Sequence, residues 1–270
     1  MTSDSHLEKV LEKGEFAVTS ECGPPRGADP TVITKKGELI KESVDAINVT
    51  DNQTSMVRMS SLSSCILCLS GDHQKFGDHA VAKNVYDMDS IHLIQTVKHM
   101  RDEGKFLGGD ELKGVPRFFI GAAANPFADP FEIRVSRLAK KVAAGAQFIQ
   151  TQCIFNLDRF KKWMELVRER GLHEKVHILG GVTPMKSVGM AKYMKKMVPG
   201  MDVPDELIDR IKGVEKEKRA EEGIKIAIET IQQLKEIEGM HGVHIMAIEW
   251  EEMVPEIAKE AGLLPRPQVD

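Results

Sequence analysis

The sequence predicts an α/β fold in which parallel strands form a (β/α) barrel of the TIM type. Short apolar runs alternate with amphipathic helical patterns along the chain, which is typical of βα units in a parallel sheet. Polar residues follow the ends of these runs, where such barrels carry their functional side chains. The length of 270 residues is close to the roughly 250 that one barrel uses, so we expect residues 1–270 to form a single barrel domain.

Seven apolar runs are short enough to be strands and end in polar or turn residues. They span residues 16–20, 46–49, 66–69, 118–123, 148–152, 176–182 and 243–248. Helical periodicity predicts helices over 1–13, 29–43, 55–64, 89–101, 130–144, 156–170, 184–197, 203–211, 214–238 and 251–261. Asp129-Pro130 is expected to cap the helix over 130–144, and Gly145 to end it.

Seven strands are one fewer than a complete barrel has. The helix over 55–64 runs into the strand over 66–69 with almost no connection, whereas a loop between a helix and a strand takes about 2–6 residues. We therefore expect the barrel to lack one strand–helix unit between Ser64 and Ile66.

Composition excludes several classes of protein. The chain has 37 basic and 41 acidic residues, so its net charge of −4 does not predict a nucleic-acid surface. No apolar run approaches the ~18–20 residues of a membrane span, and four cysteines do not make a disulfide scaffold, so a reducing cytoplasm is expected. The glycine-rich fingerprints of dinucleotide folds and P-loops are absent from the sequence.

Two groups of polar residues at strand ends are candidates for chemistry. The loop after the strand over 66–69 carries Asp72, His73, Asp78 and His79, and a solvated loop is the alternative explanation. Glu21 follows the first strand and precedes a stiff Gly-Pro-Pro segment, where a salt bridge within the loop is the alternative.

These residues belong to four ordered motifs: SECGPPR at 20–26, NVTDN at 48–52, SGDH at 70–73 followed by YDMDSI at 86–91, and AAGAQFIQTQ at 143–152. Together they resemble the methylenetetrahydrofolate reductase family, and the resemblance runs from about Phe16 to Pro267. Members of that family carry an additional strand and helix between the segments matching 59–62 and 69–72, which agrees with the short connection noted above.

The resemblance implies a flavoenzyme that reduces 5,10-methylenetetrahydrofolate to 5-methyltetrahydrofolate, with the hydride passed through flavin N5. Glu21 matches the family's general acid, Asp72 its aspartate near flavin and folate, and Gln152 its pterin-positioning glutamine. The expected cofactor is FAD, with FMN as the alternative. Residues expected to bind it are Thr50, Ser70, Gly71, Asp72, His73, Tyr86, Asn125, Lys140 and Lys141.

Some positions leave alternatives open. Ser70 stands where well-known members have Arg, and Lys140 and Lys141 could be solvated lysines late in a helix. Cys65 and Cys68 have metal-like spacing but no second pair, so structural thiols are expected and no metal.

The expected partners are tetrahydrofolate and an electron donor, either NAD(P)H or a partner subunit with iron–sulfur clusters. We also expect the chain to form an oligomer. The alternatives are a non-catalytic or partner-dependent barrel subunit of a methyl-transfer complex, and a pterin-binding methyltransferase.

Overall fold

The computed structural model describes residues 3–25, 29–50, 88–198 and 200–269. Within these ranges six strands form one sheet, and every neighbouring pair is parallel. The strands are β1 (Ala17–Cys22), β2 (Ala46–Val49), β3 (Gly121–Ala124), β4 (Phe148–Cys153), β5 (His177–Val182) and β6 (Gly242–Ile245).

The strand order is β2-β1-β6-β5-β4-β3. The first and last strands of the chain are neighbours, as they are in a closed barrel, and β2 and β3 are the two ends of the described sheet. The prediction of an α/β fold with parallel, barrel-like strands is confirmed for this arc. The expected helix over 55–64, the strand over 66–69 and the short connection at Ser64–Ile66 lie outside the described residues, so the missing unit stays a prediction.

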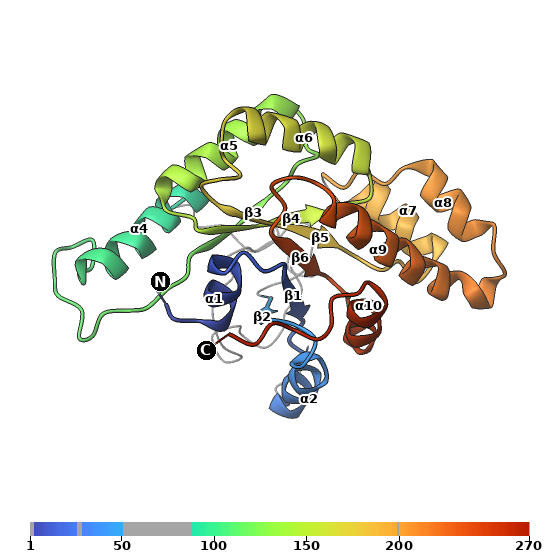
Figure 1. The fold of residues 1–270 in the computed structure, drawn as a ribbon, viewed down its shortest axis with the longest axis horizontal. Helices are drawn as coiled ribbons and strands as arrows, with labels where there is room; N and C mark the ends of the chain where they lie inside the picture. The colour runs from blue at the N-terminus through green and yellow to red at the C-terminus, as the bar shows by residue number, and fades with distance from the viewer. Residues whose placement is uncertain (1–2, 26–28, 51–87, 199, 270) are drawn as a thin grey trace, which may run out of the picture.

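Helices cover the outer side of this arc (Figure 1). α2 packs on β1, α5 on β3, and α9 on β5 and β6, as expected for helices that follow parallel strands. The helices and short 3₁₀ turns are α1 (His6–Glu12), α2 (Pro30–Ile40), α4 (Ser90–Glu103), α5 (Phe131–Ala144), α6 (Leu157–Glu169), α7 (Val188–Met197), α8 (Asp205–Lys212), η3 (Lys216–Lys218), α9 (Arg219–Lys235), η4 (Glu251–Met253) and α10 (Val254–Glu260).

Local capping chemistry sets several helix boundaries. Asp89 and Asn156 accept backbone N–H groups at the starts of α4 and α6. Ser187 does the same for α7, which therefore begins later than the predicted residue 184. The expected long helix over 214–238 is wrong in extent, because one 3₁₀ turn precedes an α-helix of only Arg219–Lys235.

The expected cap at Asp129 is wrong. Pro130 occupies the N-cap position of α5, and no side chain accepts a hydrogen bond there. Asp129 lies one residue before this position, and its exposed carboxylate lies 2.8 Å from the Arg159 guanidinium of α6.

Apolar side chains pack on both sides of the sheet. Between strands and helices lies the main core, which includes Val18, Ile149, Ile178 and Val243. On the inner side α1 closes the amino-terminal end, where Leu7, Val10 and Leu11 pack with other buried apolar residues, namely Ala17, Phe148 and Leu179. Because side chains alternate along a strand, Thr19 and Glu21 share the inner face with Ala17. The amino-terminal end of the arc is thus apolar, and polar side chains follow toward the carboxyl end.

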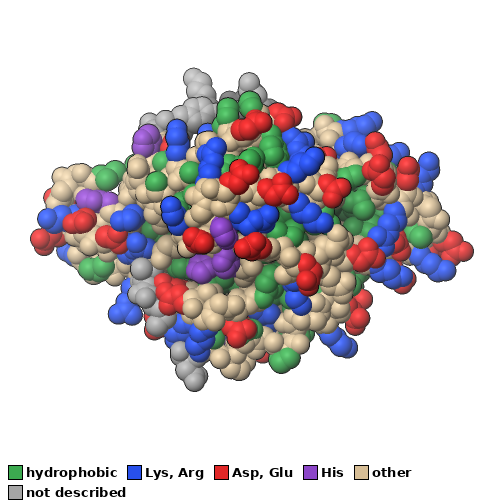
Figure 2. All heavy atoms as spheres, turned by 45° about the horizontal axis from the view of Figure 1, so that its top comes forward, with side chains coloured by type: hydrophobic (Ala, Val, Ile, Leu, Met, Phe, Trp, Pro, Cys, Tyr) green, Lys and Arg blue, Asp and Glu red, His purple; other side chains and the backbone are tan. Residues whose placement is uncertain are grey.

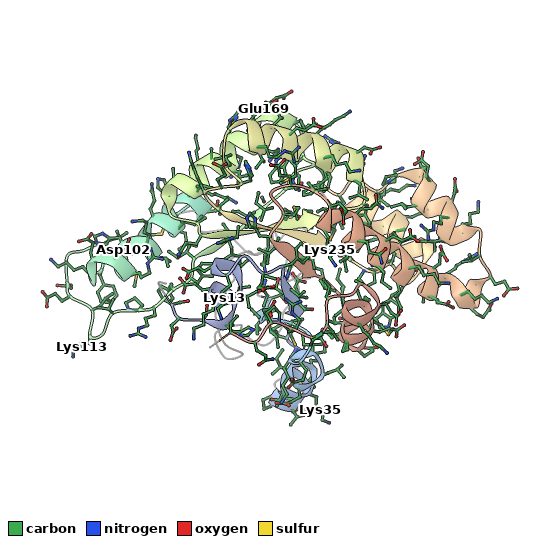
Figure 3. All side chains as sticks on the ribbon, in the orientation of Figure 1. Lys13, Lys35, Asp102, Lys113, Glu169 and Lys235 are labelled. Atoms are coloured by element: carbon green, nitrogen blue, oxygen red, sulfur yellow. The ribbon has the colours of Figure 1, made fainter. Side chains whose placement is uncertain are left out.

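Acidic and basic side chains mix over the molecular surface. Figure 2 shows both kinds intermingled across one face, and the labelled Lys113 and Glu169 lie at the rim of the view in Figure 3. This mixture fits the near-balance of charge in the sequence. Among the described helices, none is both long and apolar enough to cross a membrane.

Candidate active site

Glu21 is the penultimate residue of β1, which ends two residues later than the sequence predicted. On one side its backbone pairs with Asn48 of β2. Its carboxylate oxygen Oε1 lies 3.4 Å from Nε2 of His244, which is on β6, and about 20% of the Glu21 side chain is exposed. The carboxylate is therefore open to solvent on one side and held by an imidazole on the other.

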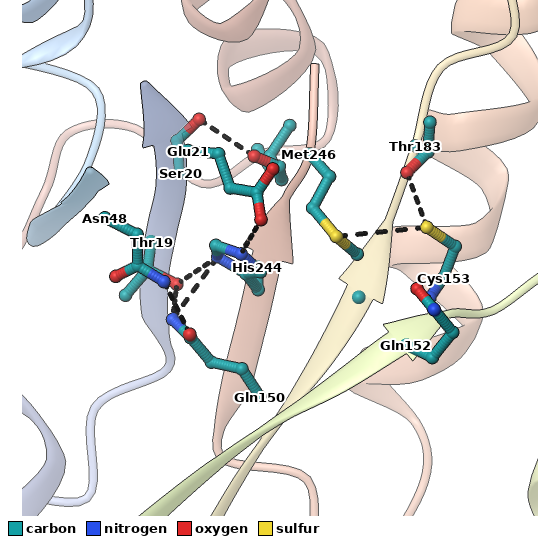
Figure 4. A network of polar contacts seen from close by, with 12 residues as sticks. Thr19, Ser20, Glu21, Asn48, Gln150, Gln152, Cys153, Thr183, His244 and Met246 are labelled. Carbon is teal, nitrogen blue, oxygen red and sulfur yellow. Dashed lines mark hydrogen bonds and ion pairs between the residues drawn. The ribbon is translucent and has the colours of Figure 1, made fainter. Parts of the chain in front are cut away.

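A chain of polar side chains, half-buried at Asn48 and buried from there on, connects to His244 (Figure 4). Asn48 Nδ2 donates to Gln150 Oε1 at 2.5 Å. Gln150 Nε2 donates to Thr19 Oγ1 at 3.0 Å and lies 3.3 Å from His244 Nδ1. Thr19 Oγ1 is 2.9 Å from the same Nδ1. The side chains of Thr19, Gln150 and His244 are all buried, so these bonds replace water.

The donor pattern fixes the imidazole tautomer. The Gln150 oxygen accepts from Asn48, which turns the Gln150 amide nitrogen toward Thr19 and His244. Both groups near His244 Nδ1 can donate to it, so in the neutral ring the proton belongs on Nε2. That N–H faces Glu21. The network is therefore arranged to hold a carboxylate at position 21.

Gln152 lies at an irregularity in the sheet. The register between β4 and β5 shifts between Gln150 and Cys153, as at a β-bulge. Thr151 Oγ1 accepts the Gly181 N–H at 2.9 Å, and Gln152 Oε1 accepts the Cys153 N–H at 3.0 Å. The amide oxygen of Gln152 is thus turned back to the strand, which orients its NH₂ group away from it.

The predicted cofactor residues that the structure describes flank the two ends of the sheet. Thr50 directly follows β2, and Asn125 directly follows β3. Asn125 Oδ1 accepts the Phe127 N–H, which fixes the turn after β3. Each residue therefore lies at the carboxyl end of an outer strand of the described sheet, and its role in binding a cofactor stays a prediction.

The two neighbouring lysines of α5 differ. Lys141 Nζ donates to the carbonyl oxygen of Ala123 in β3 at 2.5 Å, and burial lowers the pKa of this ammonium. Lys140 is exposed on the helix surface. The structure therefore brings Lys141, and not Lys140, to the end of β3.

The remaining predicted residues lie outside the described ranges. They are Ser70, Gly71, Asp72, His73, Tyr86, Cys65 and Cys68. Their roles stay predictions.

Two cysteines are buried at the carboxyl side of the sheet. Cys153 Sγ lies 2.9 Å from Thr183 Oγ1 and 3.9 Å from the sulfur of Met246. Burial raises the pKa of Cys153 to about 12 and, with the nearby Glu251 carboxylate, that of Cys22 to about 11. Both are packed thiols and not nucleophiles. No cluster of three potential metal ligands occurs among the residues that the structure covers.

The hollow at the opposite end of the sheet is separate from this site. Its volume is about 290 Å³, and His173, His177 and His241 line it together with Glu12. His177 and His241 meet edge to face with ring centroids 4.9 Å apart, and burial lowers the pKa of His241 to about 4. These neutral rings lie at the amino-terminal side of the strands, away from Glu21.

Sequence reasoning missed Thr19, Gln150 and His244 as site residues. Each is a polar residue inside an apolar strand, which is a signal because a buried polar side chain needs a partner. The sequence does not say which of them meet.

Comparison with known proteins gives one family and one fold. The family model described as methylenetetrahydrofolate reductase matches residues 63–262. Methylenetetrahydrofolate reductase 2 of Schizosaccharomyces pombe is 28% identical over 218 residues, covering 74% of this chain and 32% of that protein. A probable methylenetetrahydrofolate reductase (NADPH) of Caenorhabditis elegans is 26% identical over 194 residues, covering 69% of this chain and 27% of that protein. The chain spans about a third of the length of these curated relatives.

A solved structure shares the fold. It is an uncharacterized protein from Clostridium thermocellum that binds two copies of 5-methyl-5,6,7,8-tetrahydrofolic acid. The TM-score is 0.56 at 15% sequence identity, and the match covers 95% of this chain and 98% of that one. At this identity the likeness establishes the fold alone.

Proposed function

Because the chain belongs to the methylenetetrahydrofolate reductase family, we propose that it reduces 5,10-methylenetetrahydrofolate to 5-methyltetrahydrofolate with a bound flavin. The observation that carries the proposal is the Glu21 carboxyl group, held by His244 at the carboxyl end of a barrel strand. The names of the relatives support the reaction. The methyltetrahydrofolate bound to the solved structure of similar fold supports the substrate class.

The described residues fit a flavin. A hydroxyl at Thr50 lies at the carboxyl end of β2, and an amide at Asn125 and an ammonium at Lys141 lie at the carboxyl end of β3. Such groups suit the phosphate and hydroxyl oxygens of a flavin nucleotide. FAD is the proposed form, with FMN as the alternative. When bound, the flavin would supply the hydride.

Glu21 would act as the acid that opens the five-membered ring of the substrate. It would protonate the departing ring nitrogen and become a carboxylate. The Nε2–H of His244 faces that carboxylate, and Thr19 and Gln150 hold the ring in the required tautomer. The network would therefore stabilise the charge that Glu21 acquires when its proton leaves.

Gln152 would position the pterin through its NH₂ group, because its oxygen is already bonded to the backbone of Cys153. Asp72 is proposed to stabilise the cationic iminium that ring opening forms. The electron donor would be NADPH, as the name of the Caenorhabditis relative suggests, or a partner protein with iron–sulfur clusters.

The second candidate is a folate-binding barrel without hydride transfer, such as a methyltransferase or a subunit of a methyl-transfer complex. The methyltetrahydrofolate in the similar solved structure favours it, since binding that compound requires no reductase chemistry.

One set of measurements tests the proposal. The purified protein should show flavin absorbance near 370–450 nm, roughly the range of any bound flavin. After chemical reduction, methylenetetrahydrofolate should reoxidise it in a stopped-flow instrument. Glu21→Gln should slow that reoxidation by about 10²–10⁴-fold and leave reduction by NADPH almost unchanged. A protein that gains no absorbance on titration with FAD or FMN, yet binds methyltetrahydrofolate, would support the second candidate instead.

A further inference from the structure

A buried ion pair lies beside the end of β1. Lys36 of α2 and Glu251 of η4 approach to 2.7 Å between Nζ and Oε1. The Glu251 side chain is 5% exposed and that of Lys36 is 25% exposed. Removing charged groups from water costs free energy, so a buried ion pair needs specific partners. The residue that this pair contacts lies close to Glu21 in the chain.

The pair brackets a single residue, Gly23. Its N–H donates to Glu251 Oε1 at 3.4 Å, and its carbonyl oxygen accepts from Lys36 Nζ at 3.4 Å. Gly23 is the first residue after β1 and is two positions from Glu21. Both polar groups of this residue are thus tied to the same two side chains.

Glu251 reaches Gly23 from the β6 side of β1, where the pairing between strands ends earlier than on the β2 side. β1 pairs with β2 as far as Cys22–Val49, but its register with β6 ends at Ser20–Ile245. His244 is on β6, so its distance to the Glu21 carboxylate depends on how the end of β1 lies against the chain that leaves β6. Glu251 belongs to that departing chain.

We propose that Lys36 and Glu251 are positioning residues for Glu21, which clamp the end of β1 toward β6 and so maintain the contact between Glu21 and His244. The inference rests on the proposed function, because it assigns the clamp to the acid of that reaction. It adds two residues that lie outside the four motifs quoted above and whose printed contacts are with each other and with the backbone of Gly23.

Paired variants separate positioning from stability. Lys36→Met or Glu251→Gln alone leaves one partner of the pair buried without its counterpart, so both should lower the melting temperature. The double variant Lys36→Met/Glu251→Leu removes both charges with similar volume and should recover the melting temperature. This double variant still lacks both side-chain contacts to Gly23. The kcat for reoxidation of the flavin by methylenetetrahydrofolate should therefore remain about 10–100-fold below that of the original protein, with KM nearly unchanged. Lys36→Arg keeps the positive charge, and its rate should stay within about threefold of that of the original protein. If the double variant regains both the rate and the melting temperature, the pair is only structural and the proposal is overturned.

A second measurement does not depend on activity. Cys22 lies between Glu21 and Gly23, is 1% exposed, and should be alkylated slowly by iodoacetamide. Lys36 lowers the pKa of this thiol, so removing its charge alone would slow alkylation further. A loosened strand end would instead expose the thiol.

We expect Lys36→Met to raise alkylation at Cys22, followed by peptide mass spectrometry, about tenfold. An unchanged or slower reaction overturns the clamp. If the original protein does not oxidise reduced flavin with methylenetetrahydrofolate, the proposed function has failed, and the Cys22 result alone decides whether the pair holds the end of β1.

Discussion

Replacing Thr19 by Val tests whether the buried polar chain sets the reactivity of Glu21. The substitution keeps the shape of the side chain but removes a hydroxyl that bonds Gln150 at 3.0 Å and lies 2.9 Å from His244 Nδ1. Losing it should destabilise the protein by about 1–3 kcal/mol, since buried partners lose a bond. Gln150 remains 3.3 Å from Nδ1, so the tautomer is weakened and not abolished. A loss of about 1 kcal/mol in the reacting state corresponds to a rate roughly five- to tenfold lower.

Ser20→Ala is the matched control. Ser20 is as buried as Thr19 and also links β1 to β6, since its hydroxyl donates to the Ile245 carbonyl at 2.9 Å. Ser20 is on the opposite face of the strand, and Lys36 and Glu251 still hold Gly23 in this variant, so Ser20→Ala should cost about 1 kcal/mol of stability and slow the reaction much less than Thr19→Val. Thermal melts and stopped-flow reoxidation of reduced flavin by methylenetetrahydrofolate measure both effects. Equal slowing by the two variants would refute the reasoning, because it would mean that general loosening of β1, and not the imidazole tautomer, controls the rate.

Three further predictions follow from other parts of the structure. Gln152→Ala should weaken folate binding about tenfold and leave flavin content unchanged, as measured by titration calorimetry and absorbance; lost flavin with unchanged folate affinity would contradict the assigned role. Burial lowers the pKa of His241 to about 4, so as the pH falls below about 6.5 this histidine is protonated in the unfolded chain before it is protonated in the folded one. The free energy of unfolding should therefore be highest above about pH 6.5 and fall by about 1–2 kcal/mol toward pH 4, allowing for partial exposure of the ring. Urea midpoints across that range should show this slope, and His241→Asn should reduce it. In α2, Gly37→Ala should stabilise the protein by about 0.5–1 kcal/mol, because a Cβ there meets open space. In α9, Gly223→Ala should destabilise the protein by about 1–3 kcal/mol or more, because a Cβ would lie 1.8 Å from the Met185 carbonyl oxygen. Thermal melts that rank the two glycine variants in the opposite order would contradict this packing argument.

Local patterns were enough for much of the fold. Six of the seven predicted strands are present in the described residues, with their ends shifted by up to three residues. They can be found from the sequence because an apolar run bounded by turn residues is a property of neighbouring residues. The capping of α4 by Asp89 is equally local. The cap assigned to Asp129 is wrong because α5 begins at Phe131, one residue later than predicted, which leaves Asp129 before the N-cap position.

The candidate site divides in the same way. The sequence by itself placed Glu21, Thr50, Asn125 and Gln152 at the ends of different strands, since the end of a strand can be found from the sequence around it. Parallel strands bring those ends to one side of a sheet, so a site there could be predicted.

Only the tertiary structure decided what surrounds Glu21. Thr19 and His244 are 225 positions apart in the chain, and Gln150 is 131 positions from Thr19. Alternation along each strand tells which residues share a face, but their contact depends on the order and register of β1, β4 and β6 in the sheet. The pairing of β1 with β6 brings the imidazole to the carboxylate, because packing of the whole sheet, and not any local pattern, sets that register.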